Sequence, residues 1–274
     1  MILLRPGEGE TVTEKPERTI RILLDHELAD VTWSRYEAGE RGPGPHVHRR
    51  HVDAFYVLTG ELEFGVGPDV APVRAPAGTL VVVPQLVVHT FRNASDAKAT
   101  YLNVHAPSCG FAAHLRGDSA GFDSEDPPSD GGRDPADVVV TPAGGGERFE
   151  RENRTIAILG DMPELSVLEI AFDPDFDVSP HTHDDHVDAF FVLDGDVAFA
   201  PAAKPLVRAS GPVEGVRGNR EVPPGRAWLR TAPGTFTAAP PGAVHGFRGT
   251  NGGRSRVLNL HTPDAGFANS VRRH

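Results

Sequence analysis

The sequence is poor in cysteine and in aromatic residues. Its 274 residues include a single cysteine, Cys109, which excludes a disulfide within the chain and a metal site built from several thiolates. Aromatic residues make up 7% of the chain, whereas glycine and proline number 30 and 25, a balance that favours short strands and turns over long helices. Any bound metal must therefore be held by nitrogen and oxygen ligands.

The chain also lacks basic clusters and long apolar runs. Its formal net charge is -11, and no group of lysines and arginines could displace counterions from a phosphate backbone, so we expect no nucleic-acid partner. The apolar start before Arg5 is far shorter than the core of a signal peptide, and no apolar run approaches the length of a membrane span. We therefore expect no membrane partner and a cytoplasmic location.

What the sequence does contain is an internal repeat. The segment PHVHRRHVDAFYVLTG at residues 45–60 returns as PHTHDDHVDAFFVLDG at residues 180–195. The offset between matching residues grows from 135, between His46 and His181, to 156, between His89 and His245, so the second copy carries an insertion. Other matching pieces are RTIRIL at 18–23 with RTIAIL at 154–159, and LNVHAPSCGF at 102–111 with LNLHTPDAGF at 258–267.

The repeat predicts two domains, at residues 1–117 and 141–274, with an inserted loop in the second near 201–230. The intervening stretch 118–140 is acidic and rich in proline, glycine and serine, which is typical of an exposed linker. Apolar segments in both halves are short, β-branched and bounded by turn residues, without a helical pattern between them. They predict an all-β fold of two antiparallel sandwiches or barrels, in which Gly60 and Gly195 close hairpins.

The histidines of each copy form a pattern typical of metal ligands. Two of them lie two residues apart, so a strand places both imidazoles on one face. A carboxylate follows after four residues and a third histidine lies downstream, which makes a set of three nitrogens and one oxygen suited to a divalent transition metal. The candidate ligands are His46, His48, Asp53 and His89 in the first copy and His181, His183, Asp188 and His245 in the second.

These motifs resemble those of the cupin superfamily, and two copies in one chain resemble a bicupin of the conserved-barrel type. The resemblance implies two tandem jelly-roll β-barrels and up to two ions of Fe, Mn, Ni, Cu or Zn per chain. Both copies have Asp where the family usually has Glu, so the carboxylate could bind the metal directly, bind through water or support a ligand. The residues that match the two family motifs are His46, His48, Asp53, Gly60, Gly78, Pro84, His89 and Asn93, and then His181, His183, Asp188, Gly195, Gly234, Pro240, Gly242 and His245.

Other repeated residues are candidates for the pocket or for support of the ligands. One group is apolar and predicted to lie in the core, where it would make a pocket beside the metal apolar: Phe55, Val57, Phe190 and Val192. A second group alternates with apolar residues on the terminal strand, and lines the barrel or satisfies buried polar groups: Asn103, His105, Asn259 and His261. His51 and His186 are expected in a turn, as rim histidines or as proton shuttles.

The cupin resemblance leaves three functions open, each with a small-molecule partner. The first is a metal-dependent dioxygenase, similar to quercetinase-like cupins, acting on a small aromatic, enolic or diketone substrate with Asp53 and Asp188 as ligand or base. The second is an isomerase of sugars or sugar phosphates, for which Arg49 and Arg50 are candidate phosphate contacts. The third is a metal-stabilised binding protein without turnover. We expect a monomer with barrels about a pseudo-twofold axis, or a homodimer.

Overall fold

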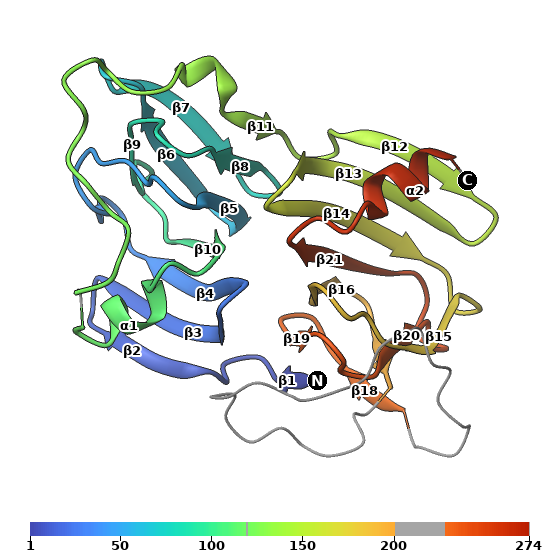
Figure 1. Ribbon diagram of the computed structural model, residues 1–274. Coiled ribbons are helices and arrows are strands. Elements are labelled where there is room, and N and C mark those ends of the chain that lie inside the picture. The colour runs from blue at the N-terminus through green and yellow to red at the C-terminus, as the bar shows by residue number, and fades with distance from the viewer. Residues whose placement is uncertain (119, 201–227, 274) are drawn as a thin grey trace. The chain divides into compact units, whose positions relative to one another are not determined.

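The computed structural model describes residues 1–118, 120–200 and 228–273, and most of the regular structure in them is β-strand (Figure 1). The chain forms two compact units. The first unit is Gly9–Gly146, and the second unit combines Met1–Glu8 with Glu147–His274. The predicted all-β fold of two repeated barrels is thereby confirmed. Within the described ranges, no helix is long and apolar enough to cross a membrane.

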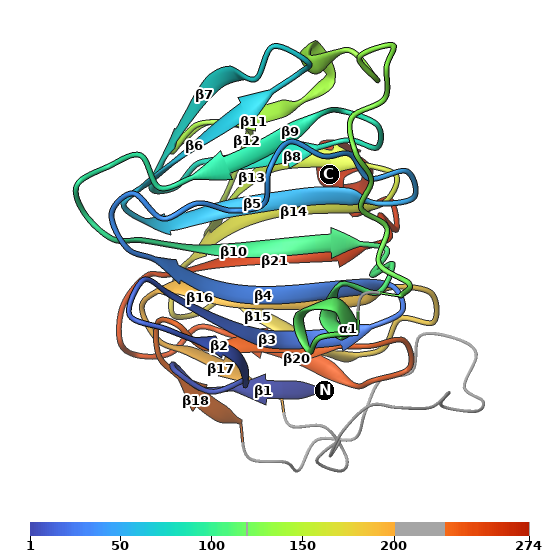
Figure 2. The same ribbon diagram turned by 90° about the vertical axis from the view of Figure 1, so that its left-hand side faces the viewer.

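The first unit is built from two antiparallel sheets. The larger sheet has the order β11-β8-β5-β10-β4-β3-β2, and Figure 2 shows β5, β10, β4 and β3 running side by side in it. The smaller sheet has the order β7-β6-β9. The elements of this unit are β2 (Glu10–Glu14), β3 (Arg18–His26), β4 (Ala29–Tyr36), β5 (Val52–Thr59), β6 (Glu61–Val66), β7 (Ala71–Pro76), β8 (Leu80–Val83), β9 (His89–Arg92), β10 (Ala99–Ala106), α1 (Phe111–Leu115), the 3-10 helix η1 (Pro135–Asp137) and β11 (Val139–Thr141).

The second unit repeats this topology. Its larger sheet has the order β1-β19-β16-β21-β14-β13-β12, and its smaller sheet has the order β15-β20-β17-β18. The elements are β1 (Ile2–Leu4), β12 (Glu147–Arg151), β13 (Arg154–Met162), β14 (Leu165–Phe172), β15 (Asp177–His181), β16 (Val187–Asp194), β17 (Val197–Phe199), β18 (Leu229–Thr231), β19 (Phe236–Ala239), β20 (His245–Arg248), β21 (Ser255–Thr262) and α2 (Phe267–Arg273).

In each unit, one edge strand of the larger sheet comes from residues outside the domain that the repeat predicts. Strand β1 pairs with β19 of the second unit, although residues 1–8 precede the first unit in sequence. Strand β11, at the end of the expected linker, pairs with β8 of the first unit. An edge strand needs only a free sheet edge, and a long connection adds little entropic cost, so sequence order does not fix this pairing.

The segment 118–140 also differs from an exposed linker where it meets the first unit. Val47 and Glu125 exchange backbone hydrogen bonds, and the Asp123 side chain is buried. Residues 201–227, most of the expected insertion, lie outside the described residues, and its end forms β18.

The expected hairpins at Gly60 and Gly195 are wrong. Both glycines have the positive φ of a tight turn, 72° and 71°. In the first unit, however, β5 pairs with β8 and β10 while β6 pairs with β7 and β9. Gly60 therefore turns the chain from one sheet to the other, and its positive φ is compatible with either kind of turn.

Candidate metal centres

The first unit gathers its four candidate ligands at one end of β5 and β9. His46 forms an isolated bridge with His89, the first residue of β9, and Asp53 is the second residue of β5. The potential ligand atoms of His46, His48, Asp53 and His89 all lie within 4.8 Å of one another. Ligands 2.0–2.2 Å from one ion are at most about 4.4 Å apart, so small shifts would bring this group around a cation.

Hydrogen bonds orient the imidazoles of this cluster. His46, His48 and His89 place Nδ1 at 2.8, 2.6 and 3.0 Å from the carbonyl oxygens of Gly44, Asp123 and Val87. A carbonyl can only accept, so each Nδ1 donates and each Nε2 keeps its lone pair. This is the arrangement in which histidines commonly bind metal through Nε2.

The Asp53 carboxylate faces these nitrogens. Its Oδ2 lies 3.4 Å from Nε2 of His89 and 3.6 Å from Nε2 of His48. Among the described residues, this nitrogen of His48 is buried without a hydrogen-bond partner. Its Oδ1 accepts a hydrogen bond from Asn103 and lies 3.4 Å from Nε2 of His105. An acceptor that faces other lone pairs is unfavourable unless a proton or a cation lies between them, so the donor set fits a divalent metal.

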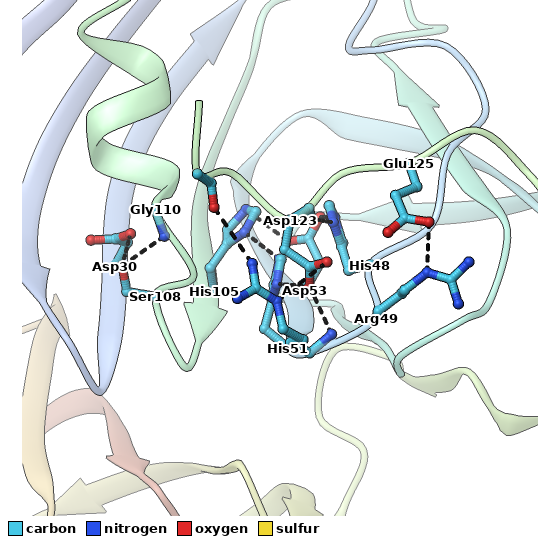
Figure 3. A network of polar contacts seen from close by, with 12 residues as sticks. Asp30, His48, Arg49, His51, Asp53, His105, Ser108, Gly110, Asp123 and Glu125 are labelled. Atoms are coloured by element: carbon cyan, nitrogen blue, oxygen red, sulfur yellow. Dashed lines mark hydrogen bonds and ion pairs between the residues drawn. The ribbon is translucent and has the colours of Figure 1, made fainter. Parts of the chain in front are cut away.

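A strap of residues 121–125 covers this cluster (Figure 3). The Asp123 carboxylate accepts from the Arg50 backbone N–H at 2.7 Å and lies 3.0 Å from Nδ1 of His51. The other nitrogen of His51 lies 2.9 Å from Nδ1 of His105. Polar contacts thus connect Asp53, through both histidines, to Asp123. His51 is fully buried, so the expectation of a rim histidine is wrong for this residue.

The second unit builds the same cluster with a more open side. His181 and His245 place Nδ1 at 2.9 and 3.0 Å from the carbonyl oxygens of Ser179 and Ala243. Nε2 of His181 lies 3.1 Å from Nε2 of His183, and Nε2 of His245 lies 3.0 Å from the Asp188 carboxylate. The His183 side chain is 26% exposed, against 2% for His48 at the matching position.

The outer contacts of the second cluster are also looser. Asn259 donates to the Asp188 carboxylate as Asn103 does to Asp53, and Nε2 of His261 lies 3.2 Å from it. Nδ1 of His261 and Nε2 of His186 are buried without partners in the part of the chain that the structure describes. The contact between His51 and His105 that supports the first cluster therefore has no counterpart between His186 and His261 in the second.

Electrostatics favour the protonation states that metal binding needs. Burial opposes ionisation of Asp53 and Asp188, but the surrounding imidazoles outweigh it and hold the pKa of both carboxyls well below the usual value. Burial, helped by neighbouring imidazoles, lowers the pKa of His46 and of His183 to about 4. His245 differs: burial lowers its pKa, but the hydrogen bond to Asp188, the charge of that carboxylate and the Ala243 carbonyl together outweigh burial and raise the pKa. Anionic carboxylates beside mostly neutral imidazoles are the metal-binding forms.

The cluster of the second unit opens into a large cavity. A cavity of about 480 Å³ in the second unit is lined by His181, His183 and Asp188 at the cluster. Aromatic and aliphatic side chains line the rest of it: Ile156, Ile170, Phe176, Val178, Phe190, Phe247, Phe267 and Val271.

The two cores differ in size at one matched position, which does not itself line the cavity. In the first unit the ring of Tyr101 is fully buried and packs 5.4–5.9 Å, centre to centre, from the rings of Tyr36, Phe55 and Phe91. The matching residue of the second unit is Val257, which pairs with Ile170 and Val192 as Tyr101 pairs with Ser34 and Val57. Replacement of a tyrosine ring by valine leaves space in the second core.

The structure brings some predicted pocket residues to the site and leaves others in the core. The Asp53 carboxylate is contacted by Asn103 and His105, and the Asp188 carboxylate by Asn259 and His261. Phe190 lines the cavity, whereas Phe55, Val57 and Val192 are fully buried core residues. Asp123 was not a candidate, since no ligand motif includes it. Arg49 and Arg50 are exposed and pair with Glu125 at 2.6 Å and Asp123 at 3.7 Å.

Comparisons with known proteins agree with this architecture. Residues 32–105 match the family model of the cupin domain named Cupin_2. Among curated proteins, the search found no match. Solved structures share the fold at low identity. The protein YlbA from E. coli has a TM-score of 0.63 and 11% identity, with 96% of this chain and 90% of that one covered.

Two further structures match over most of their length. A cupin 2 conserved barrel domain protein from Leptotrichia buccalis has a TM-score of 0.56 and 8% identity, with 91% of both chains covered. Oxalate decarboxylase from Lactobacillus farciminis, solved as a formate complex, has a TM-score of 0.61 and 10% identity, with 96% of this chain and 87% of that one covered. Residues 32–105 are thus a cupin domain, and the chain as a whole has the bicupin fold of two repeated barrels.

Proposed function

We propose that this bicupin is a metal-dependent dioxygenase that acts on a small aromatic, enolic or diketone substrate at the cluster of the second unit. The observation that supports this most is the cavity of about 480 Å³ that joins the histidine cluster to aromatic walls. Its volume lies in the usual range for small-molecule sites. A bound transition metal would supply Lewis-acid activation of the substrate and redox chemistry toward O₂. Both oxygen atoms enter the substrate, so no separate reductant is needed.

Three histidines and one carboxylate would hold the metal: His181, His183, His245 and Asp188. We assign Asp188 to the ligand set rather than to a general base. Its imidazole neighbours hold its pKa well below the usual value, and a base works best when its pKa is near the working pH. The Asn259 amide, which donates to this carboxylate, fixes its orientation.

The aromatic walls would bind a planar substrate and exclude water. Phe190 and Phe247 lie 4.9 Å apart, centre to centre, and both line the cavity. Offset stacking between rings adds to the burial of apolar area, so these side chains favour a flat apolar substrate over a sugar. The candidate phosphate contacts of a sugar-phosphate isomerase, Arg49 and Arg50, are in the first unit and do not line this cavity.

The first cluster would serve as a second metal site with a structural role. The strap of residues 121–125 covers it, and His46, His48, Asp53 and His89 are all at most 9% exposed. A ligand set closed in this way leaves little room for a substrate, whereas catalytic metals keep an open position.

Oxygen uptake by the metal-loaded protein tests the proposal. We expect O₂ consumption with one of catechol, quercetin or pentane-2,4-dione. Val257→Tyr should abolish it by placing a ring where Tyr101 lies in the first unit, without loss of bound metal. Val257→Ala, which enlarges the cavity instead, should retain uptake. Metal-loaded protein that takes up no O₂ with any of these compounds would contradict the dioxygenase.

A further inference from the structure

Arg154 brings a positive charge to the cavity of the second unit. It is the first residue of β13, and its guanidinium carbon lies 5.2 Å from the ring centre of Phe176. Both residues line the same cavity as His181 and Asp188. In the described part of the chain, Arg154 forms no ion pair and no side-chain hydrogen bond. A half-buried guanidinium in such a place can still bind an anion with geometric specificity.

The first unit holds a matched arginine that is neutralised. Arg18 pairs with Tyr36 across β3 and β4, as Arg154 pairs with Phe172 across β13 and β14. The Arg18 guanidinium lies 3.2 Å from the Glu40 carboxylate and 3.5 Å from the Tyr36 hydroxyl. The same position in the fold therefore carries an internal ion pair in one unit.

Both partners of that arginine are replaced by phenylalanine in the second unit. Phe172 stands where Tyr36 is, without the hydroxyl. Phe176 stands where Glu40 is, because its carbonyl accepts from the backbone of Gly249 as that of Glu40 accepts from Asn93. The exchange removes an acidic and a polar partner while it keeps the arginine, so the cation is left for a ligand.

Successive ring contacts connect the metal ligands at one end to the cation at the other. Phe190 is two residues from Asp188 on β16 and lies 4.9 Å from Phe247. Phe247 lies 5.7 Å from Phe176, over which the Arg154 guanidinium is placed. A ligand that reaches both ends must be elongated, with an aromatic or otherwise apolar middle.

The charges around Arg154 favour an anion. Arg151 lies directly opposite it on β12 and also lines the cavity, and like charges across a strand pair repel each other. The Arg151 guanidinium donates to the carbonyl oxygens of Glu150 and Val271, and it forms no ion pair with an acidic residue of the described ranges. Asp177 is the other carboxylate at this cavity besides Asp188, and it is exposed and makes no ion pair with either arginine.

We propose that the substrate is an elongated aromatic carboxylate, whose carboxylate binds Arg154 while its other end reaches the cluster of His181, His183, Asp188 and His245. This rests on the proposed function for the reaction at the cluster and adds the substrate class. A single guanidinium at the end of an aromatic cavity selects one carboxylate, which it can bind through two parallel hydrogen bonds.

Calorimetric binding of a matched pair of probes tests this with the full-length, metal-loaded protein. The probes are 4-phenylbutanoate and its uncharged amide, 4-phenylbutanamide. The wild type should bind the acid at least tenfold more tightly than the amide. Arg154→Leu should lose that preference with little change in amide affinity. Phe176→Glu should lose it too, because it copies Glu40 and neutralises Arg154 while keeping the guanidinium.

Arg18→Leu in the first unit is the control, and its preference for the acid should persist. Equal affinity of the wild type for both probes, or a preference that survives in folded Phe176→Glu and Arg154→Leu, would overturn the proposal. So would an absence of binding. The readout is independent of turnover. Acid preference without O₂ uptake would contradict the dioxygenase alone, and O₂ uptake without acid preference would contradict this inference alone.

Discussion

Single residues distinguish the two units where their strands correspond. Asp30 on β4 accepts hydrogen bonds from the Ser108 hydroxyl at 2.6 Å and from the Ala112 amide at 3.1 Å. By the offsets of the repeat, Ser166 occupies the position of Asp30 and Asp264 that of Ser108. The carboxylate and the hydroxyl have thus exchanged places. In the described chain, the acid of each unit keeps one buried oxygen without a hydrogen-bond partner, Oδ1 of Asp30 on β4 and Oδ1 of Asp264 after β21.

The pH dependence of stability should reveal the Asp30 carboxylate. Burial raises the pKa of Asp30 from 3.8 to about 6, so the folded state binds its proton more tightly than the unfolded state. The stability that Asp30 contributes is complete below pH 4 and is lost as the pH rises through 6. A shift of about two units corresponds to about 3 kcal/mol in the free energy of unfolding between pH 4 and pH 7.

Asp30→Asn should therefore remove this part of the pH dependence and raise the stability of the first unit at pH 7. Urea denaturation at several pH values, followed by hydrogen exchange in β3 and β4, provides the measurement. If the variant and the wild type lost stability equally between pH 4 and pH 7, burial of an ionised Asp30 would not be the cause.

At the scale of elements, the strap of residues 121–125 sets the first metal cluster apart. It supplies the carbonyl that accepts from His48, the carboxylate at His51 and the Phe122 ring, which lies 4.6 Å from the His114 ring. The helix that follows the last strand is common to both units: Phe111 of α1 lies 3.8 Å from the His105 ring, and Phe267 of α2 lies 4.8 Å from the His261 ring. The strap thus fixes the outer contacts of one cluster.

Asp123→Ala should weaken the first metal site selectively. The change keeps the backbone carbonyl for His48 but leaves Nδ1 of His51 and the Arg50 N–H without their carboxylate. Loss of such a supporting contact typically lowers metal affinity by about 10- to 100-fold. In competition with a chelator, the variant should release the ion of its first site earlier than the wild type does, while the ion of its second site is released as in the wild type. Asp185→Ala is the matched change at His186 in the second unit, and it should spare the ion at the first.

Sequence patterns predict the ligand clusters better than the elements around them. Strand spacing placed His46 and His48 on one face, and the repeat with its resemblance to the cupin motifs added Asp53 and His89 to the same site. The strap and the edge strand β1 depend on contacts between distant segments, for which no local pattern exists. The burial of His51 was missed for the same reason, since its partner Asp123 lies in a segment with the composition of a linker.

At the scale of the whole molecule, the repeat has produced two barrels of the same topology with different interiors. The first is filled by the rings of Tyr36, Phe55, Phe91 and Tyr101 and holds a covered cluster. The second has an open cavity beside a more exposed cluster. The alignment of Tyr101 with Val257 indicates a less filled second core from the sequence alone. That Arg154 lacks the acidic partner of Arg18 could be seen only from the packing within each unit. This division supports one structural and one reactive metal site.

Metal content tests this account most directly. Elemental analysis should be made on the full-length protein, purified without an affinity tag or chelator, and on its His46→Ala and His181→Ala variants. The account predicts nearly two equivalents of a transition metal per chain in the wild type and the loss of one equivalent in each variant. A folded wild type without metal, or variants that retain both equivalents, would contradict it.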